Sequence, residues 1–299
     1  MRYLIIVLVM FLVFGCVVKE AELGSAKNPI KMFFVPSMEA DKIILSGQKI
    51  ADYLLQKTGY HFKVAVPTSY AAVIEAMGTK ETDIAWLATF GYILAHEKFG
   101  AEVALTTVRK GLEKYRGQFI THVESGIEKL EDIADKTIAY TDAASTSGYM
   151  YPSATLQKNN IQPAKYFFAG GHPQVVLSVY EGTADVGCTY WSPPAESGEI
   201  KDARKRILET HPDVIEKVKI VGFTEWIPND TVTFRQNFPT EMKQQIVDAL
   251  LEFAASEKGH EILVELLDID GFVLADNADY DVVRETLKLL NIDVDEKIK

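Results

Sequence analysis

Apolar and polar residues alternate along the chain with two different periods. Residues 30–35 form a run that is apolar except for Lys31, which is typical of a strand buried on both faces. In the next segment, 41–57, the apolar residues recur at helical spacing, and Gly59 follows as a signal for the end of a helix. Further strands are predicted at 62–66, 83–87 and 101–108, and further helices at 70–77 and 89–98. This alternation predicts a mostly parallel sheet covered by helices.

The same pattern restarts after Arg109 and gives way to helices near the C-terminus. Strands are predicted at 115–122, 137–140, 166–168, 184–189 and 218–223, with helices at 127–133, 148–158, 173–180, 201–210, 240–256, 257–267 and 280–290. We therefore expect an α/β protein of two lobes. Lobe one is predicted to contain residues 29–109 and 224–299, and lobe two residues 110–223, with chain crossings near 109–114 and 224–230.

The N-terminus has the pattern of a lipoprotein signal. Arg2 precedes the apolar run 3–14, which is too short to span a bilayer as a mature helix, and the run ends with a small residue just before Cys16. We expect a signal peptide at 1–15, followed by a lipidated cysteine and tether at 16–28. The alternative interpretation is a short N-terminal anchor helix.

The composition excludes several classes of function. The chain has 31 Lys and Arg residues against 42 Asp and Glu residues, a formal net charge of −11, which is unfavourable for nucleic-acid binding. No metal site is expected because the histidines lack metal-ligand spacing, and no nucleotide cofactor because the chain has no phosphate-cradling lysine loop. Beyond Cys16 the only cysteine is Cys188, which lies in an apolar run and is interpreted as a small buried hydrophobe.

Three predicted helices begin with hydrogen-bond donors. The segments are 67–70 (Pro-Thr-Ser-Tyr), 145–148 (Ser-Thr-Ser-Gly) and 170–173 (Gly-Gly-His-Pro). A helix N-terminus carries unpaired N–H groups and the positive end of the backbone dipole, and it can bind an oxyanion. Each segment follows a predicted strand, and ligands of open α/β sheets bind at the carboxyl ends of strands. The pattern predicts a cleft that holds a small tetrahedral anion, although Ser and Thr are also ordinary N-caps.

With these motifs in view, the chain resembles the phosphate/phosphite/phosphonate-binding proteins that deliver ligand to ABC importers. The motifs that carry the resemblance are, in order, VPSME at 35–39, YAAVIEAM at 70–77, DIAWL at 83–87, STSG at 145–148, FAGGH at 168–172 and IPND at 227–230. The resemblance implies a type II periplasmic-binding-protein-like fold. In that fold two hinged lobes each contain a mostly parallel sheet with helices on both faces, and here a helical C-terminal tail follows.

The resemblance also implies which residues hold the ligand. The oxyanion is expected to bind Tyr70, Tyr115, Ser145, Thr146, Ser147 and His172. Asp230 is expected to accept a proton from the ligand or to meet an ammonium group. The chain departs from the family pattern at Pro173, at 88–91 and at 190–194, which leaves the substituent of the ligand open.

A physical argument supports the expectation for Asp230. A carboxylate repels a dianion, but it binds favourably to a ligand that carries a P–OH proton or a cationic amine. Sulfate carries no such proton at neutral pH, so the site is expected to select protonated phosphorus oxyanions by a mismatch penalty. The alternative is that Asp230, which follows Asn229, only forms a turn.

These observations predict a monomeric solute-binding lipoprotein outside the cytoplasm, without catalysis, that works with a membrane permease and its ATPase. Three alternatives stay open. The first is an enzyme on the same fold that uses His172 with Cys188 or Ser145, although a nucleophile elbow is missing. The second is a sensor lipoprotein that signals to a membrane kinase. The third is a binding protein for a sulfonate or another small oxyanion.

Overall fold

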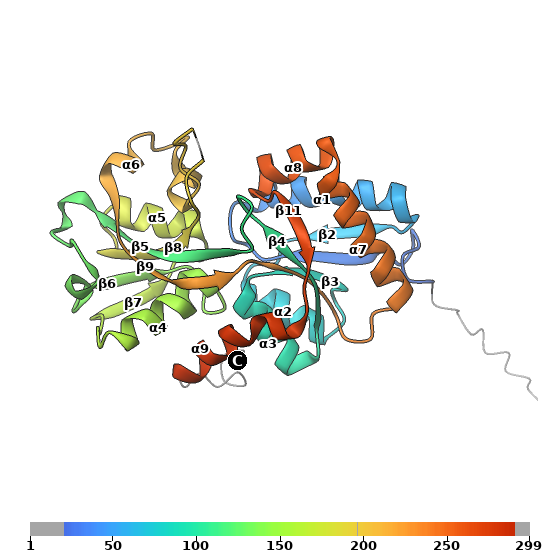
Figure 1. The fold of residues 1–299 in the computed structure, drawn as a ribbon, viewed down its shortest axis with the longest axis horizontal. Coiled ribbons are helices and arrows are strands. Elements are labelled where there is room, and N and C mark those ends of the chain that lie inside the picture. The colour runs from blue at the N-terminus through green and yellow to red at the C-terminus, as the bar shows by residue number, and fades with distance from the viewer. Residues whose placement is uncertain (1–20, 196, 291–299) are drawn as a thin grey trace, which may run out of the picture.

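The computed structural model describes residues 21–195 and 197–290 and contains two lobes that lie side by side (Figure 1). Lobe one is built on a six-stranded sheet and lobe two on a five-stranded sheet, as far as the described residues go. The predicted signal peptide at 1–15 and the predicted lipidation site Cys16 lie outside the described residues.

The sheet of lobe one has the strand order β11-β4-β10-β3-β1-β2. Its strands are β1 (Ile30–Phe34), β2 (Phe62–Ala65), β3 (Ile84–Leu87), β4 (Glu102–Val108), β10 (Thr231–Phe234) and β11 (Gly271–Leu274). Strand β1 pairs in parallel with β2 and β3, whereas β10 is antiparallel to β3 and β4, and β11 is antiparallel to β4. All four residues of β3 are buried, as expected for a strand covered on both faces.

Helices cover both faces of this sheet. They are α1 (Ala40–Thr58), α2 (Tyr70–Gly78), α3 (Thr89–Phe99), α7 (Thr240–Ala255), α8 (Glu257–Leu267) and α9 (Asp281–Leu289). One core joins the sheet to α1, α7 and α8, and a second core on the other face contains residues of α2, α3 and α9 (Figure 1). The second core also contains Tyr115, Met150 and Ile227, so it extends from lobe one into lobe two.

The sheet of lobe two has the strand order β7-β6-β8-β5-β9. Its strands are β5 (Lys114–His122), β6 (Thr137–Tyr140), β7 (Lys165–Phe168), β8 (Val186–Trp191) and β9 (Val218–Pro228), and its helices are α4 (Tyr151–Lys158), α5 (His172–Tyr180) and α6 (Val214–Lys217). Strand β6 is parallel to β7 and β8, whereas β5 runs antiparallel to β8 and β9. Cys188 is buried in the core of this lobe, as the sequence predicted, and burial raises the pKa of its thiol.

Two of the helices predicted in lobe two are shorter than expected. The segments 127–133 and 201–210 contain only the 3-10 turns η2 (Leu130–Ile133) and η4 (Ala203–Ile207). The predicted helix 148–158 begins instead with a π-helical turn, η3 (Thr146–Met150), and continues as α4. Pro152 explains this turn, because proline has no N–H to donate to the carbonyl of Gly148. That carbonyl accepts from Thr141 N at 3.2 Å, and Tyr151 N donates to Thr146 O.

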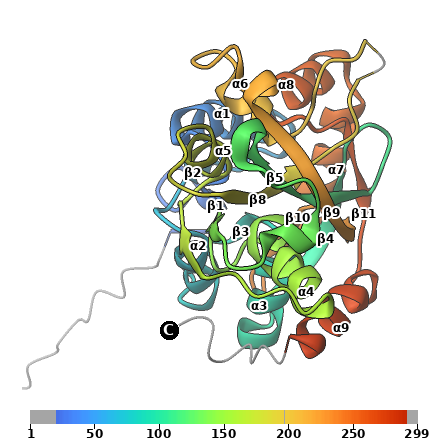
Figure 2. The same cartoon turned by 90° about the vertical axis from the view of Figure 1, so that its left-hand side faces the viewer.

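The lobes are joined by β strands and by a C-terminal helix. Strand β9 runs without interruption to Pro228, which pairs with Lys114 at the start of β5, and the chain then enters β10 in lobe one. The strand therefore extends into the predicted crossing at 224–230. Helix α9 contacts both α3 and α4, and Figure 2, which looks at the molecule from the end of lobe two, shows α4 and α9 close together.

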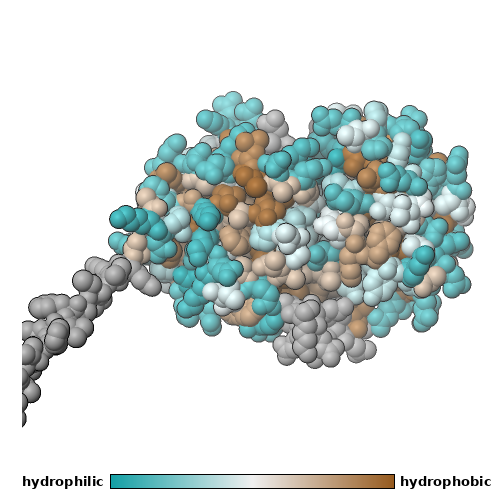
Figure 3. All heavy atoms as spheres, turned by 180° about the vertical axis from the view of Figure 1, so that it is seen from behind, coloured by the Kyte–Doolittle hydropathy of each residue, from teal (hydrophilic) through white to brown (hydrophobic). Residues whose placement is uncertain are grey.

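Hydrophilic side chains dominate the surface seen from behind, and apolar ones gather there in small patches (Figure 3). Within residues 21–195 and 197–290, none of the helices combines the length and hydropathy that a membrane span requires. In the same residues, no three His, Cys, Asp or Glu side chains are grouped as a metal site would need.

A buried ion pair holds the sheet of lobe one together and supports a test of stability. Asp83 accepts from Arg235 Nε at 2.8 Å and from Lys31 N at 2.9 Å, and the two ionic side chains are 5% and 14% exposed. We predict that Asp83→Asn lowers the free energy of unfolding by about 3–5 kcal/mol, because it leaves Arg235 buried without its partner. Denaturant titration measures the change.

The exposed pair of Glu102 with Lys243 provides the control for that experiment. Its N–O distance is 2.9 Å, and the Glu102 side chain is 55% exposed. We expect Glu102→Gln to change the free energy of unfolding by less than about 1 kcal/mol. Equal losses in the two variants would contradict the structural role given to Asp83.

Candidate functional site

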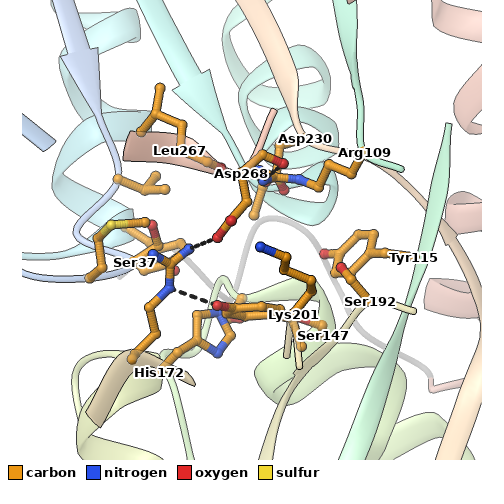
Figure 4. Close-up of a pocket in the computed structure, with 17 residues that line it drawn as sticks. Ser37, Arg109, Tyr115, Ser147, His172, Ser192, Lys201, Asp230, Leu267 and Asp268 are labelled. Atoms are coloured by element: carbon orange, nitrogen blue, oxygen red, sulfur yellow. Dashed lines mark hydrogen bonds and ion pairs between the residues drawn. The ribbon is translucent and has the colours of Figure 1, made fainter. Parts of the chain in front are cut away.

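A cavity of about 80 Å³ lies between the two lobes. Lobe one contributes residues at the ends of β1, β4, α2 and α8, and lobe two contributes residues of β5, β8, η4 and the starts of η3 and α5. The polar lining residues are Ser37, Tyr70, Arg109, Tyr115, Ser145, Ser147, His172, Tyr190, Ser192, Lys201, Arg206, Asp230 and Asp268, most of which are labelled in Figure 4. The ends of helices and strands from distant parts of the sequence therefore surround one small cavity.

Six of the seven residues expected to hold the ligand line this cavity. They are Tyr70, Tyr115, Ser145, Ser147, His172 and Asp230. The hydroxyl of Thr146 points elsewhere: Thr146 Oγ1 accepts from Phe90 N, in lobe one, at 2.7 Å. The side chain of Thr146 thus connects the two lobes and is not among those that line the cavity, and the predicted contact of Thr146 with the ligand stays a prediction.

The start of α2 is capped by the protein itself. Ser69 Oγ accepts from Ala72 N at 3.1 Å, and the carboxylate of Asp142, from lobe two, lies near enough to the backbone N–H of Tyr70 for that group to lower its pKa. Burial raises the pKa of Asp142, and the N–H groups of Ala144 and Tyr70 lower it again in part. Since the carboxylate of Asp142 already lies at the first amide of α2, the group that Tyr70 contributes to the cavity is its hydroxyl. Burial raises the pKa of this hydroxyl well above its usual value.

The turn that begins η3 has little free space around its backbone. Ser145 Oγ accepts from Gly148 N at 3.1 Å, so Ser145 is an N-cap as well as a cavity residue. A Cβ atom added at Gly148 would lie 2.1 Å from Thr141 Oγ1. Glycine is therefore required at position 148 for the hydroxyls of this turn to reach the cavity. The Tyr115 hydroxyl, opposite, stays protonated because burial raises its pKa.

His172 is a neutral hydrogen-bonding group in this site. Burial, with a smaller contribution from the charge of Arg206, lowers the pKa of His172 to about 3. Its Nδ1 lies 2.7 Å from Thr189 Oγ1 and 3.2 Å from Thr141 Oγ1. Hydroxyls that donate to Nδ1 favour the tautomer with the proton on Nε2, which can then donate to an anion. The ring of Tyr190 contacts the imidazole edge-on, with 4.9 Å between the ring centroids.

Asp230 faces the cavity in an ion pair with Arg109. The distance from Arg109 Nη2 to Asp230 Oδ2 is 3.0 Å, and Arg109 Nη1 also donates to the carbonyls of Leu267 and Asp268. Burial raises the pKa of Asp230 and Arg109 opposes that shift. The side chain of the preceding Asn229 donates to two backbone carbonyls at 2.9 Å, which fixes the strand end from which Asp230 projects.

Four charged residues of the cavity were not found by sequence reasoning: Arg109, Lys201, Arg206 and Asp268. Arg206, from lobe two, donates from Nη2 to Asp268 Oδ2 at 2.7 Å and from Nε to Tyr190 Oη at 2.8 Å. Asp268 ends α8 in the left-handed conformation, with φ of 53°. The sequence pattern contains no signal for Lys201 and Arg206, because residues 201–210 resemble one polar helical segment. Arg109 and Asp268 are held by partners far away in sequence.

The protein shares its fold with a known class of proteins and its sequence with a known family. The two-lobe architecture is that of type II periplasmic binding proteins, which confirms the predicted fold class. A binding protein component of an ABC phosphonate transporter from Pseudomonas aeruginosa superposes with a TM-score of 0.78 at 22% identity, over 91% of this chain and 89% of that chain. The family model described as "ABC transporter, phosphonate, periplasmic substrate-binding protein" matches residues 32–280. The chain belongs to this family.

Curated relatives support the same family. The phosphate-import protein PhnD of Mycolicibacterium smegmatis is 26% identical over 175 residues, which is 54% of this chain and 54% of the relative. The phosphonates-binding periplasmic protein of Escherichia coli is 25% identical over 219 residues, which is 71% of this chain and 62% of the relative. The chain thus spans between about half and three fifths of the length of these two relatives.

The buried neutral His172 generates a prediction for the pH dependence of stability. Its folded pKa of about 3 lies below the ordinary value of 6.5, so the unfolded chain binds the proton first as the pH falls. The contribution of His172 to stability is therefore complete above pH 6.5 and decreases below it, by about 1.4 kcal/mol per pH unit.

Denaturant titration of the wild type and of His172→Gln across this range tests the assignment. Phosphate buffers must be avoided, because a bound anion would stabilise the folded state. We expect the difference in unfolding free energy between the two proteins to shrink as the pH falls. Parallel pH profiles would mean that His172 is not held neutral in the fold.

Proposed function

We propose that this protein is the solute-binding component of an ABC importer and that it captures phosphate, phosphite or a phosphonate in the cavity between its lobes. The observation that carries the proposal is the convergence of Tyr70, Tyr115, Ser145, Ser147, His172 and Asp230 on one cavity. These residues come from both lobes, so a ligand there contacts both at once. Membership of a family of periplasmic substrate-binding proteins supports the same function.

The donors that would bind the oxyanion are uncharged. Burial keeps the hydroxyls of Tyr70 and Tyr115 protonated, and His172 is neutral at physiological pH. Hydrogen bonds from such donors to a charged ligand contribute about 1.5–3 kcal/mol each. Several of them together are sufficient for micromolar or tighter affinity, since a Kd of about 1 μM corresponds to −8.2 kcal/mol.

The lobes are proposed to move about the two crossings near 109–114 and 224–230, with lobe one containing 29–109 and 224–299 and lobe two containing 110–223. The structure has the lobes in contact: Thr146 Oγ1 accepts from Phe90 N, His172 N donates to Ser37 O at 3.4 Å, and Arg206 pairs with Asp268. Ligand binding would stabilise this closed form. The closed form would then dock on a membrane permease driven by an ATPase, and the protein itself would catalyse no reaction.

The location proposed for the protein is outside the cytoplasm, as for the family, with an anchor formed by lipid on Cys16. The motif at 1–16 supports the anchor. In this proposal the mature protein is a monomer tethered to a membrane surface through the segment 16–28.

Calorimetric titration of the mature protein tests the function. The panel contains phosphate, phosphite, methylphosphonate and sulfate, and the protein is first dialysed into a buffer free of phosphorus. We expect saturable binding of at least one phosphorus oxyanion at micromolar concentration or below, and at least tenfold weaker binding of sulfate. A protein that is folded by circular dichroism and binds none of the phosphorus oxyanions would contradict the proposal.

Asp230 is proposed to distinguish ligands that carry a P–OH proton from ligands that do not. We predict that Asp230→Asn narrows the preference for protonated phosphorus oxyanions over sulfate by about tenfold, because the carboxylate no longer repels an anion without a P–OH group. The same titration measures both affinities. If the ratio of the two affinities stays as in the wild type, Asp230 only supports the strand end through Arg109.

A further inference from the structure

One lysine of the cavity is directed toward its interior. The side chain of Lys201 is 10% exposed and lines the cavity, and Figure 4 shows its ammonium pointing into the space between Asp268 and Ser147. Its ion-pair partner is Glu199, at 2.9 Å, whose side chain is 50% exposed and is not part of the cavity wall. The side chain of Lys201 therefore points into the cavity, whereas its carboxylate partner, Glu199, remains at the surface.

The carboxylates of the cavity are already paired. Asp230 lies 3.0 Å from Arg109, and Asp268 lies 2.7 Å from Arg206. Of the described residues that line the cavity, three are thus cationic and two anionic, and Lys201 is the cation without a carboxylate partner inside. A ligand with an ammonium group would be repelled by Lys201 and would find both carboxylates already paired. A ligand with a second anionic group would be attracted by the ammonium of Lys201.

The phosphoryl group itself does not require Lys201. Its proposed donors, Tyr70, Tyr115, Ser145, Ser147 and His172, are uncharged side chains that line the same cavity. The cavity volume of about 80 Å³ is several times the roughly 10–15 Å³ that one water requires, so the cavity accepts more than one water-sized group.

We propose, on the basis of the proposed function, that the preferred ligand is a phosphonate with a second anionic group on a short carbon chain, and that Lys201 binds this group. A carboxylate is the simplest such group, because it forms a charge-assisted hydrogen bond with an ammonium. Lys201 is then a residue that determines specificity, distinct from the donors that hold the phosphoryl group.

The test compares three phosphonates of similar size by calorimetry: phosphonoacetate with a second anion, methylphosphonate with none, and aminomethylphosphonate with a cation. We expect the wild type to bind phosphonoacetate at least about tenfold more tightly than either of the others. In Lys201→Met the affinity for phosphonoacetate falls by about 30-fold or more, while that for methylphosphonate changes less than about threefold.

Lys205 provides the matched control. It pairs with the same Glu199, at 2.8 Å, and lies 3.9 Å from Asp268, but it does not line the cavity. Lys205→Met removes the same charge from the neighbouring turn η4, so it reproduces the electrostatic effect on Glu199 and Asp268 without a contact with the ligand. We expect it to change the affinity for phosphonoacetate less than about threefold, since screening weakens charges that do not touch the ligand.

The possible outcomes separate the two proposals. Equal losses of phosphonoacetate and methylphosphonate binding in Lys201→Met would assign the lysine to the phosphoryl group and overturn this inference. A wild type that prefers methylphosphonate or aminomethylphosphonate would also overturn it. This outcome would leave the proposed function intact, and it can be measured on the wild type alone. A folded wild type that binds no phosphorus compound would contradict the proposed function itself.

Discussion

The contact between Thr146 and Phe90 is the interaction on which the site depends. Neighbouring residues of a helical turn point about 100° apart. Because the hydroxyl of Thr146 is directed into lobe one, those of Ser145 and Ser147 face the cavity on either side of it. The same three-residue sequence thus joins the lobes and supplies donors. The missing N–H of Pro152 and the small size of Gly148 keep the turn in this shape.

Two kinds of polar group line the cavity, uncharged donors and paired charged side chains, and the proposals give them different roles. The proposed phosphoryl site uses hydroxyls and a neutral imidazole, whose protonation does not change at physiological pH. Charged side chains line the same cavity in pairs such as Arg206 with Asp268. In the proposals, the uncharged donors bind the oxyanion, and the charged groups discriminate between ligands by what else the ligand carries.

The sequence predicts the parts of this structure that depend on local pattern. Strand–helix alternation was sufficient for the two-sheet α/β architecture. Helix starts with hydroxyl or glycine residues located four of the residues that line the cavity, Tyr70, Ser145, Ser147 and His172. The antiparallel strands β10 and β11 were missed although other four-residue strands such as β3 were predicted; both pair with β4, which is far away in sequence. Arg109 and Asp268 were missed for a related reason: Arg109 is held by Asp230 and Asp268, which are far away in sequence, and Asp268 meets Arg206 only across the lobes.

The carboxylate of Asp142 at the start of α2 has a consequence for the energetics of the proposed function. It is a contact between the lobes that the protein makes with its own atoms, as are those of Thr146 and Arg206. Each such contact lowers the free energy of the closed state whether or not a ligand is present. In the proposed importer, the ligand needs to contribute only the remaining difference in free energy, so a weakly bound ligand is enough to complete closure. Such a protein would collect scarce solutes, but it would discriminate less between its full and its empty form.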